Sequence, residues 1–191
     1  VGKSSISSVV ANEGFSYDYN TTIGVDFFAL NRKIGNVRWK MHLWDTAGQE
    51  NFNSITRCYY KEAAITLLIF DLTRPQTFYD IDRWKQDVEK INPTTHFILI
   101  GNKMDLPRKV PANEIDEWTA KNDILYFEVS AKNSQFRSNK IAMPLSCGNG
   151  SNDMFILILG DFEKKKNRDN NIGIKNNNPK CEKNKGRSCL V

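Results

Sequence analysis

The first residues of the chain have side chains suited to phosphate and metal chemistry. Gly2, Lys3 and Ser4 spell GKS, the tripeptide that ends the phosphate-binding loop G-x-x-x-x-G-K-[ST]. In that loop the lysine ammonium binds phosphate oxygens and the serine hydroxyl binds Mg²⁺. A GKS tripeptide arises by chance in many chains, so it predicts a nucleotide site only when further motifs support it.

A second motif, WDTAGQE, occupies residues 44–50. Asp45 follows an apolar, strand-like stretch and can hold Mg²⁺ through water. Gly48 has no side chain, so its backbone N–H can approach a γ-phosphate closely. Gln49 can orient an attacking water. A simple turn would account for DTAG, but the full heptamer is far more specific and indicates phosphoryl chemistry.

Two further motifs indicate which base the nucleotide carries. NKMD, residues 102–105, offers the Asp105 carboxylate to two adjacent donors, the N1–H and the exocyclic amine of guanine. Adenine presents an acceptor there, so a buried carboxylate would be left unpaired and would repel it. SAK, residues 130–132, adds the backbone amide of Ala131, which can bind the guanine carbonyl. Taken singly, NKMD is also a plausible surface loop, and SAK is the weakest motif.

These motifs follow the expected strands of a parallel α/β sheet. Continuous apolar runs predict interior strands at 65–70, 97–100 and 124–129. Two more strands are predicted at 24–30 and 37–43, with a turn at Gly35-Asn36. Helices are predicted over 6–11, 75–90, 111–121 and 152–166. Asp45, Asn102 and Ser130 each come just after a strand, which predicts that they meet at the ligand-binding edge of the sheet.

The length and composition indicate one globular domain, and the cysteine pattern indicates that the protein resides in the reducing cytosol. Of the 191 residues, 40% are hydrophobic, which is enough for a core. No apolar run approaches the roughly 20 residues that span a bilayer, and no secretory signal heads the chain. The four cysteines show no C-x-x-C spacing, which argues against a zinc site: Cys58, Cys147, Cys181 and Cys189.

Charge is concentrated at the carboxyl end of the sequence. Residues 164–191 hold nine Lys and Arg against Asp169 and Glu182, a net charge of +7, whereas the rest of the chain has a net charge of −2. This Asn-rich tail has few large apolar groups, which predicts disorder. A basic tail can bind an anionic membrane surface or nucleic acid, or simply remain solvated. No recognition motif supports nucleic acid as a partner.

The order GKS…T…DTAGQ…NKMD…SAK resembles the signature elements of the Ras-superfamily small GTPases over residues 1–132. Within that superfamily, TTIGVDF (21–27), WDTAGQE and YYKEA (59–63) are similar to motifs of the Rab branch. The resemblance implies a P-loop NTPase small G domain, with a mostly parallel six-stranded sheet flanked by helices. It implies a G domain over 1–166 with an irregular insertion at 136–151, then a disordered basic tail over 167–191.

The resemblance also assigns roles to individual residues. The residues implied to bind phosphate are Gly2, Lys3, Ser4, Thr22 and Gly48, with Gln49 as the catalytic residue. Those implied to hold Mg²⁺ are Ser4, Thr22 and, through water, Asp45. Those implied to bind guanine are Phe15, Asn102, Lys103, Asp105, Ser130, Ala131 and Lys132. Phe27, Trp44 and Tyr59 match an aromatic triad that contacts effectors, although ordinary packing would also explain them.

The function implied is a switch that hydrolyses GTP to GDP and recruits effectors in vesicle and membrane traffic. Hydrolysis is slow alone, and an activating protein that supplies an arginine adds about 10³–10⁵ in rate. The implied partners are an exchange factor, the activating protein, effectors and a prenylation escort or GDI-type carrier at the cytosolic face of intracellular membranes. The alternative is a degenerate, non-hydrolysing scaffold, because the phosphate loop lacks its first half.

Three features depart from the family pattern. The resemblance predicts a central strand and a GDxxx loop before Val1, which suggests a truncated gene model or a fragment. Residues 136–151 lack periodicity and are either an insertion loop or translated intronic sequence. Cys189 is followed by only two residues and does not fit C-a-a-X. We expect it to carry one geranylgeranyl group that anchors the chain together with the basic tail, the alternative being a free thiol.

Overall fold

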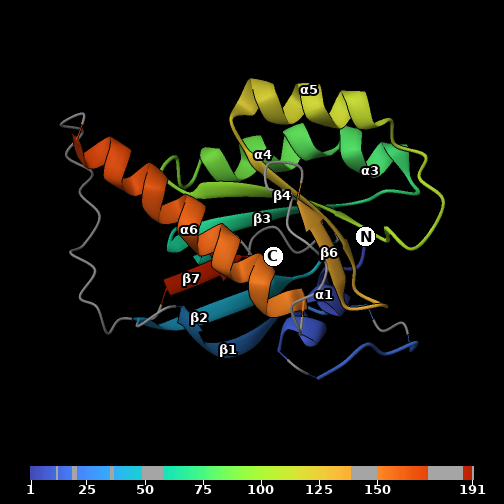
Figure 1. Ribbon diagram of the computed structural model, residues 1–191, viewed down its shortest axis with the longest axis horizontal. Helices are drawn as coiled ribbons and strands as arrows, with labels where there is room; N and C mark the ends of the chain where they lie inside the picture. Colours follow the sequence, from blue (N-terminus) through green and yellow to red (C-terminus); the bar gives the residue numbers. More distant parts are fainter. Residues whose placement is uncertain are drawn as a thin grey trace.

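The computed structural model describes residues 1–11, 13–18, 21–34, 37–48, 58–138, 150–171 and 187–190. Its centre is a seven-stranded sheet in the order β1-β2-β7-β3-β4-β5-β6 (Figure 1). The strands are β1 (Val25–Ile34), β2 (Val37–Thr46), β3 (Ala63–Asp71), β4 (His96–Asn102), β5 (Leu125–Ser130), β6 (Gln135–Ser138) and β7 (Arg187–Leu190). Strands β2, β7, β3, β4 and β5 are parallel, whereas β1 and β6 pair antiparallel at the two edges.

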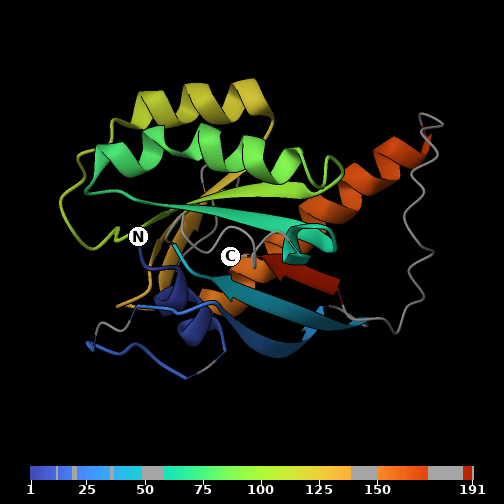
Figure 2. The same ribbon diagram turned by 180° about the vertical axis from the view of Figure 1, so that it is seen from behind.

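Helices cover both faces of the sheet. They are α1 (Lys3–Val10), α3 (Pro75–Tyr79), α4 (Ile81–Glu89), α5 (Ala112–Asn122) and α6 (Gly150–Asn171). Helices α3, α4 and α5 lie on one face, and α1 and α6 lie on the other (Figures 1 and 2). This arrangement confirms the predicted α/β fold class.

Strand β3 shows why the apolar residues of an interior strand occur on both of its faces. Ile65, Leu67 and Ile69 belong to the core under α1 and α6, whereas Leu68 and Phe70 belong to the core under α3, α4 and α5. Successive side chains of a strand point to opposite faces, and helices cover both faces here. A continuous apolar run is therefore the pattern that an interior strand of this sheet requires.

The helix predicted over residues 75–90 is two helices in the structure. Helix α3 has Pro75 in its first turn, a position where the missing N–H costs nothing. It ends at Tyr79, and Asp80 is both its C-cap and the N-cap of α4. Helix α5 ends at Asn122, and its C-cap Asp123 has a φ of 49°, in the left-handed region that stops a helix.

A buried carboxylate links β5 to the edge of the sheet. Glu128 in β5 pairs with Arg108 and with Arg137 of β6, the second at 2.7 Å, and accepts a hydrogen bond of 3.0 Å from Tyr126. Burial raises the pKa of Glu128, but the arginine bonds outweigh it and leave the pKa below its ordinary value. This network holds β6 against β5.

The carboxyl-terminal part of the chain differs from the prediction in two respects. Helix α6 begins at Gly150, within the predicted irregular insertion, and continues to Asn171, beyond the predicted end. Residues Arg187–Leu190, within the stretch predicted to be disordered, form β7 between β2 and β3 (Figure 2). The resemblance placed a central strand at this position. The backbone of β7 pairs in parallel with both β2 and β3.

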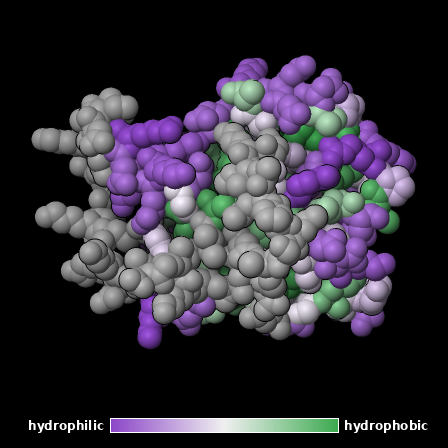
Figure 3. Space-filling view, viewed as in Figure 1, coloured by the Kyte–Doolittle hydropathy of each residue, from purple (hydrophilic) through white to green (hydrophobic). Residues whose placement is uncertain are grey.

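The surface seen in Figure 3 is hydrophilic over α5 and over the carboxyl-terminal half of α6. That half of α6 holds Lys164, Lys165, Lys166 and Arg168. Within the part of the chain that the structure describes, no helix is both long enough and apolar enough to cross a membrane.

Candidate functional site

The GKS segment forms the start of α1 and lies against the end of β4. Gly2 has a φ of +93°, and its carbonyl accepts a hydrogen bond of 3.1 Å from the Ile6 amide. A Cβ on Gly2 would lie 2.4 Å from Nδ2 of Asn102, which donates a 3.0 Å hydrogen bond to the carbonyl of Val1. Two features therefore require a glycine at position 2: the positive φ and the close approach of Asn102.

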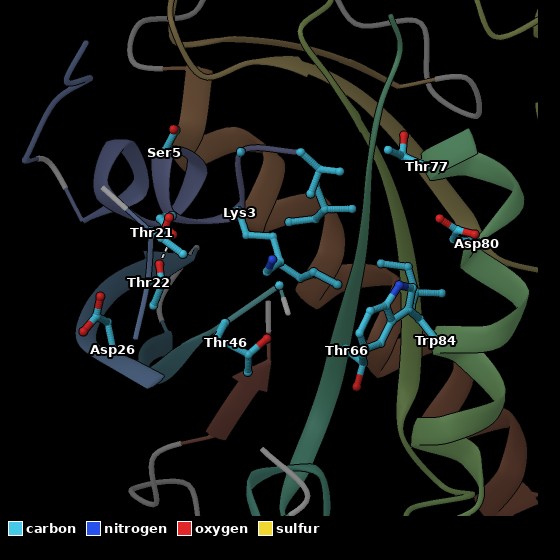
Figure 4. A pocket seen from close by; sticks show the side chains of 18 of the residues that line it. Lys3, Ser5, Thr21, Thr22, Asp26, Thr46, Thr66, Thr77, Asp80 and Trp84 are labelled. Atoms are coloured by element: carbon cyan, nitrogen blue, oxygen red, sulfur yellow. Dashed lines mark hydrogen bonds between the residues drawn. The ribbon is translucent and has the colours of Figure 1, made fainter. Parts of the chain in front are cut away.

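Lys3 extends from the start of α1 toward Gly48, the residue singled out in WDTAGQE. A Cβ on Gly48 would lie 2.7 Å from the Lys3 ammonium nitrogen. Burial lowers the pKa of Lys3, and the nearby Asp45 carboxylate partly opposes that effect. Lys3 points into the cavity shown in Figure 4, so its charge is available to an anionic ligand there.

Three oxygen-bearing side chains gather beside Lys3. The hydroxyl oxygens of Ser4 and Thr22 are 2.7 Å apart. Asp45, at the carboxyl end of β2, is fully buried, and neither of its carboxylate oxygens has a hydrogen-bond partner among the described residues. Burial raises its pKa, and the Ser4 hydroxyl and Lys3 oppose that shift. A buried carboxylate without a partner beside two hydroxyls is an oxygen set that suits Mg²⁺.

A cavity of about 830 Å³ opens beside these residues. Lys3, Thr22 and Asp26 lie on one side of it, and Thr66 of β3 and Trp84 of α4 lie on the other (Figure 4). The volume is within the range of natural ligand pockets, which is about 300–1,000 Å³. The cavity therefore has both the size and the charged wall that a phosphorylated ligand needs.

The NKMD and SAK segments lie next to each other at the ends of β4 and β5. The backbone N–H of Ala131 donates to Oδ1 of Asn102 at 3.3 Å, so the Asn102 side chain joins SAK to Val1. The Ser130 hydroxyl donates to Oδ1 of Asp105 at 2.7 Å. This bond fixes the orientation of the exposed Asp105 carboxylate.

Lys103 is held in place by a carboxylate that the sequence analysis did not assign to the site. Its φ is 66°, and its ammonium nitrogen is 2.7 Å from Oδ2 of Asp71 at the end of β3. Burial raises the pKa of Asp71, but the bonds from Lys103 and Thr73 outweigh it and lower the pKa. Asp71 stands at the carboxyl end of a largely apolar strand, as Asp45, Asn102 and Ser130 do, and this shared placement is the signal that would have identified it.

The remaining candidates for guanine binding lie around Tyr17. The Phe15 and Tyr17 rings pack edge to face with centroids 5.3 Å apart, and the Lys132 ammonium lies 5.6 Å from the centroid of the Tyr17 ring. Tyr17 is 81% exposed and was not predicted, because one exposed aromatic residue in a loop has no distinguishing pattern. These residues do not line the cavity, whereas Val1, which Asn102 joins to Ala131, does.

The three aromatic residues of the expected effector triad are in contact. The rings of Phe27 and Trp44 have centroids 4.6 Å apart, and those of Trp44 and Tyr59 are 4.5 Å apart. Phe27 is 48% exposed, which is unusual for a large apolar side chain that also packs against two neighbours. The row of rings is therefore a surface feature as well as a packing contact.

The structure thus brings together the residues predicted for phosphate and Mg²⁺, and separately those predicted for guanine. Gln49, the predicted catalytic residue, lies outside the described residues. Cys189, the predicted lipid attachment site, lies within β7. The roles of all these residues stay predictions.

Comparison with known proteins identifies the family. The sequence profile described as "Ras family" matches residues 1–143. Ras-related protein Rab-2B of Dictyostelium discoideum is 39% identical over 137 residues, which cover 69% of this chain and 67% of that protein. RabQ of the same organism is 42% identical over 135 residues, covering 69% and 66%, and human Rab-25 is 39% identical over 137 residues, covering 70% and 64%.

These matches span about two thirds of the length of the relatives. The profile covers well over half of the chain, and the matched part includes all four motifs. The chain therefore belongs to the Ras family of small GTPases, as a Rab-type member.

Proposed function

We propose that the chain binds GTP and GDP together with Mg²⁺ and acts as a slow GTPase switch in membrane traffic. The observation that carries the proposal is the buried Asp45 carboxylate, which has no hydrogen-bond partner among the described residues and lies beside the Ser4 and Thr22 hydroxyls. An ionised carboxylate in that position requires a cation or strong donors. Mg²⁺ bound to phosphates supplies the charge.

Each group of residues has a definite task in this proposal. Lys3 and the backbone of Gly48 bind the terminal phosphates, and Ser4 and Thr22 hold Mg²⁺ while Asp45 orders its water. Mg²⁺ neutralises charge on the phosphates when it is bound. The Asp105 carboxylate, oriented by Ser130, selects guanine.

Thr22 and Gly48, which contact the terminal phosphate in this proposal, also explain how effectors distinguish the GTP-bound from the GDP-bound chain. Thr22 and Gly48 lie on two different segments, and phosphate contacts that order such segments are lost on hydrolysis. Trp44 immediately precedes Asp45 and stacks on Phe27 and Tyr59. We therefore assign effector binding to this aromatic row, and we expect exchange factors, activating proteins and carriers to recognise the same two segments.

Membrane association belongs to the same proposal. Relatives named as Ras-related Rab proteins support a role in traffic. The basic residues after position 163 suit an anionic surface, and lipidation of Cys189 would supply the second signal that stable anchoring requires.

The test is a titration of the chain with a fluorescent guanine nucleotide, in Mg²⁺ and in EDTA, with GTP and ATP as competitors. Asp45→Asn should abolish the Mg²⁺ dependence of binding. The matched control is Asp26→Asn, because Asp26 also lines the cavity but is exposed. Competition by GTP and not by ATP supports the proposal. Absence of binding by the parent chain contradicts it and favours the scaffold alternative.

A further inference from the structure

We propose that two buried carboxylates, Glu128 and Asp71, position the guanine segment, residues 102–110, through ion pairs with a basic residue near each end of it. Each carboxylate belongs to a strand of the sheet, and Asp105 lies between the two pairs in the sequence. This role rests on the proposed function, because Asp105 is the residue expected to select guanine. Neither carboxylate lines the cavity, and each acts through another side chain.

The middle of the guanine segment is exposed, whereas its backbone is tied to the sheet near both ends. Residues 105–109 are all exposed. Before them, the amide of Met104 donates a 3.0 Å hydrogen bond to the carbonyl of Val129. At their end, the amide of Lys109 donates a 2.8 Å hydrogen bond to the carbonyl of Leu72. Exposed loops are more mobile than the elements they connect. The direction of the carboxylate that reads guanine therefore depends on side-chain contacts within this stretch.

Strand β5 presents two polar side chains to the guanine segment. Glu128 and Ser130 are two residues apart, so they point to the same face of the strand. Tyr126, one more step of two residues back, belongs to the core under α3, α4 and α5, which identifies that face (Figure 1). The Ser130 hydroxyl bonds Asp105. Glu128 bonds Arg108, three residues further along the segment. One strand thus holds the segment at two points, and one of these points is the carboxylate that reads guanine.

The charge of Glu128 makes its bond to the guanine segment a strong one. The Glu128 side chain is only 9% exposed and pairs with both Arg108 and Arg137. The Arg137 side chain is 64% exposed, whereas that of Arg108 is 31% exposed. Ion pairs in contact with water are worth little, and a buried charge is costly when a partner is removed. Arg108 is therefore the more important partner, and it ties the segment to β5.

Asp71 holds the segment at its other end. Its side chain is 1% exposed, and its Oδ1 accepts hydrogen bonds from the amide and the hydroxyl of Thr73 at 2.9 and 2.7 Å, which fix the carboxylate. Its Oδ2 lies 2.7 Å from the ammonium nitrogen of Lys103. Lys103 has a φ of 66°, in the left-handed region that residues other than glycine adopt rarely. The ion pair stabilises this unfavourable conformation two residues before Asp105.

The orientation of Asp105 can be measured by comparing two nucleotides. Its carboxylate is expected to accept hydrogen bonds from the N1–H and from the exocyclic amine of guanine, and both bonds require one orientation of the carboxylate. Inosine lacks the exocyclic amine, so ITP can make only the first bond. The ratio of the affinities for GTP and ITP therefore reports how well Asp105 is oriented. A variant that only destabilises the fold lowers both affinities alike and leaves the ratio unchanged.

The experiment measures how GTP and ITP compete with a fluorescent guanine nucleotide for the full chain in Mg²⁺. Arg108→Ala removes the arginine that belongs to the guanine segment. Arg137→Ala is the matched control, because it removes the other arginine from the same carboxylate. We expect the parent to prefer GTP over ITP roughly tenfold or more, as one charge-assisted hydrogen bond provides. Arg108→Ala should lower this preference about threefold or more, whereas Arg137→Ala should leave it unchanged.

Asp71→Asn tests the other end of the segment. It keeps the shape of the side chain and removes the charge that pairs with Lys103, so the preference for GTP over ITP should fall as in Arg108→Ala. Urea denaturation shows whether each variant is folded. A preference that stays at the parent value in Arg108→Ala and Asp71→Asn overturns the positioning role while the proposed function stands, and so does an equal fall in Arg137→Ala. If Arg108→Ala fails to fold, Asp71→Asn decides by the same ratio. A parent that binds no guanine nucleotide overturns the proposed function, and the positioning role with it.

Discussion

Replacing Gly2 by alanine tests the close packing of the GKS segment against Asn102. Gly2 has a φ of +93°, and the new Cβ would lie 2.4 Å from Nδ2 of Asn102, a distance that real Cβ atoms do not tolerate. Asn102 is only 2% exposed and uses both ends of its amide, donating to the Val1 carbonyl and accepting from the Ala131 amide. It cannot move away without losing at least one of these bonds.

The expected cost has two parts. An alanine in the left-handed region costs roughly 1–2 kcal/mol relative to glycine. Displacing the Asn102 amide leaves a buried group unpaired, which costs about 1–3 kcal/mol more. We therefore expect Gly2→Ala to lower the free energy of unfolding by about 2–5 kcal/mol, measured by urea denaturation of the nucleotide-free chain.

The chain offers a matched control at Gly24. Its φ of +85° is close to that of Gly2, but a Cβ there meets nothing within 4 Å. Gly24→Ala should therefore cost only the backbone part, about 1–2 kcal/mol. In an Asn102→Ala background the clash partner is absent, so Gly2→Ala should fall to the cost of Gly24→Ala.

A double-mutant cycle makes the result decisive. The interaction energy between Gly2→Ala and Asn102→Ala should be about 1–3 kcal/mol, well above the roughly 0.5 kcal/mol expected for independent sites. If Gly2→Ala and Gly24→Ala cost the same, and the cycle gives no coupling, the proposed contact between the GKS segment and β4 does not exist.

Three further substitutions test other parts of the site and the sheet. Gly48→Ala displaces the flexible end of Lys3, so stability should change by less than about 0.5 kcal/mol while nucleotide affinity falls roughly tenfold or more in a fluorescence titration. Asp105→Ala removes two charge-assisted hydrogen bonds to guanine and should weaken GTP about 10²–10³-fold without strengthening ATP, as a competition assay will show. Glu128→Gln should cost about 1.5–3 kcal/mol at neutral pH. Because the folded pKa of Glu128 lies below its ordinary 4.5, this cost should be complete above about pH 4.5 and disappear as the pH falls further, in urea denaturation at a series of pH values.

Much of the fold was predictable because its strands carry strong local patterns. The apolar runs that predict β3, β4 and β5 also predict burial on both faces, and the structure confirms it. The break between α3 and α4 was not predictable, since Phe78, Ile81 and Val88 keep helical spacing across it and all are buried. Periodicity indicates which face of a segment is buried, and it does not indicate a break between two successive helices.

The site was predictable where residues stand at the ends of strands, and not where loops bring them together. Asp45, Asn102 and Ser130 were expected at one edge of the sheet from their places after strands, and the structure places each within the last two residues of a strand. Tyr17 reaches Phe15 and Lys132 only through the course of a loop. Strand β7 has only four residues, too few for a pattern, and its place is defined by pairing with β2 and β3, which lie far from it in the sequence.

The position of β7 divides the candidate site into two halves. Asp45 is the second-last residue of β2 and belongs to the half expected to bind Mg²⁺, whereas β4 and β5 end in Asn102 and Ser130, which belong to the segments expected to bind guanine. Neighbouring strands lie about 4.8 Å apart, so β7 holds β2 and β3 roughly twice that distance apart. The contact of Gly2 with Asn102 and the hydrogen bond from Asn102 to Val1 join the GKS segment, on the phosphate side, to the end of β4, on the guanine side. Gly2→Ala therefore acts on the connection between the two halves of the site.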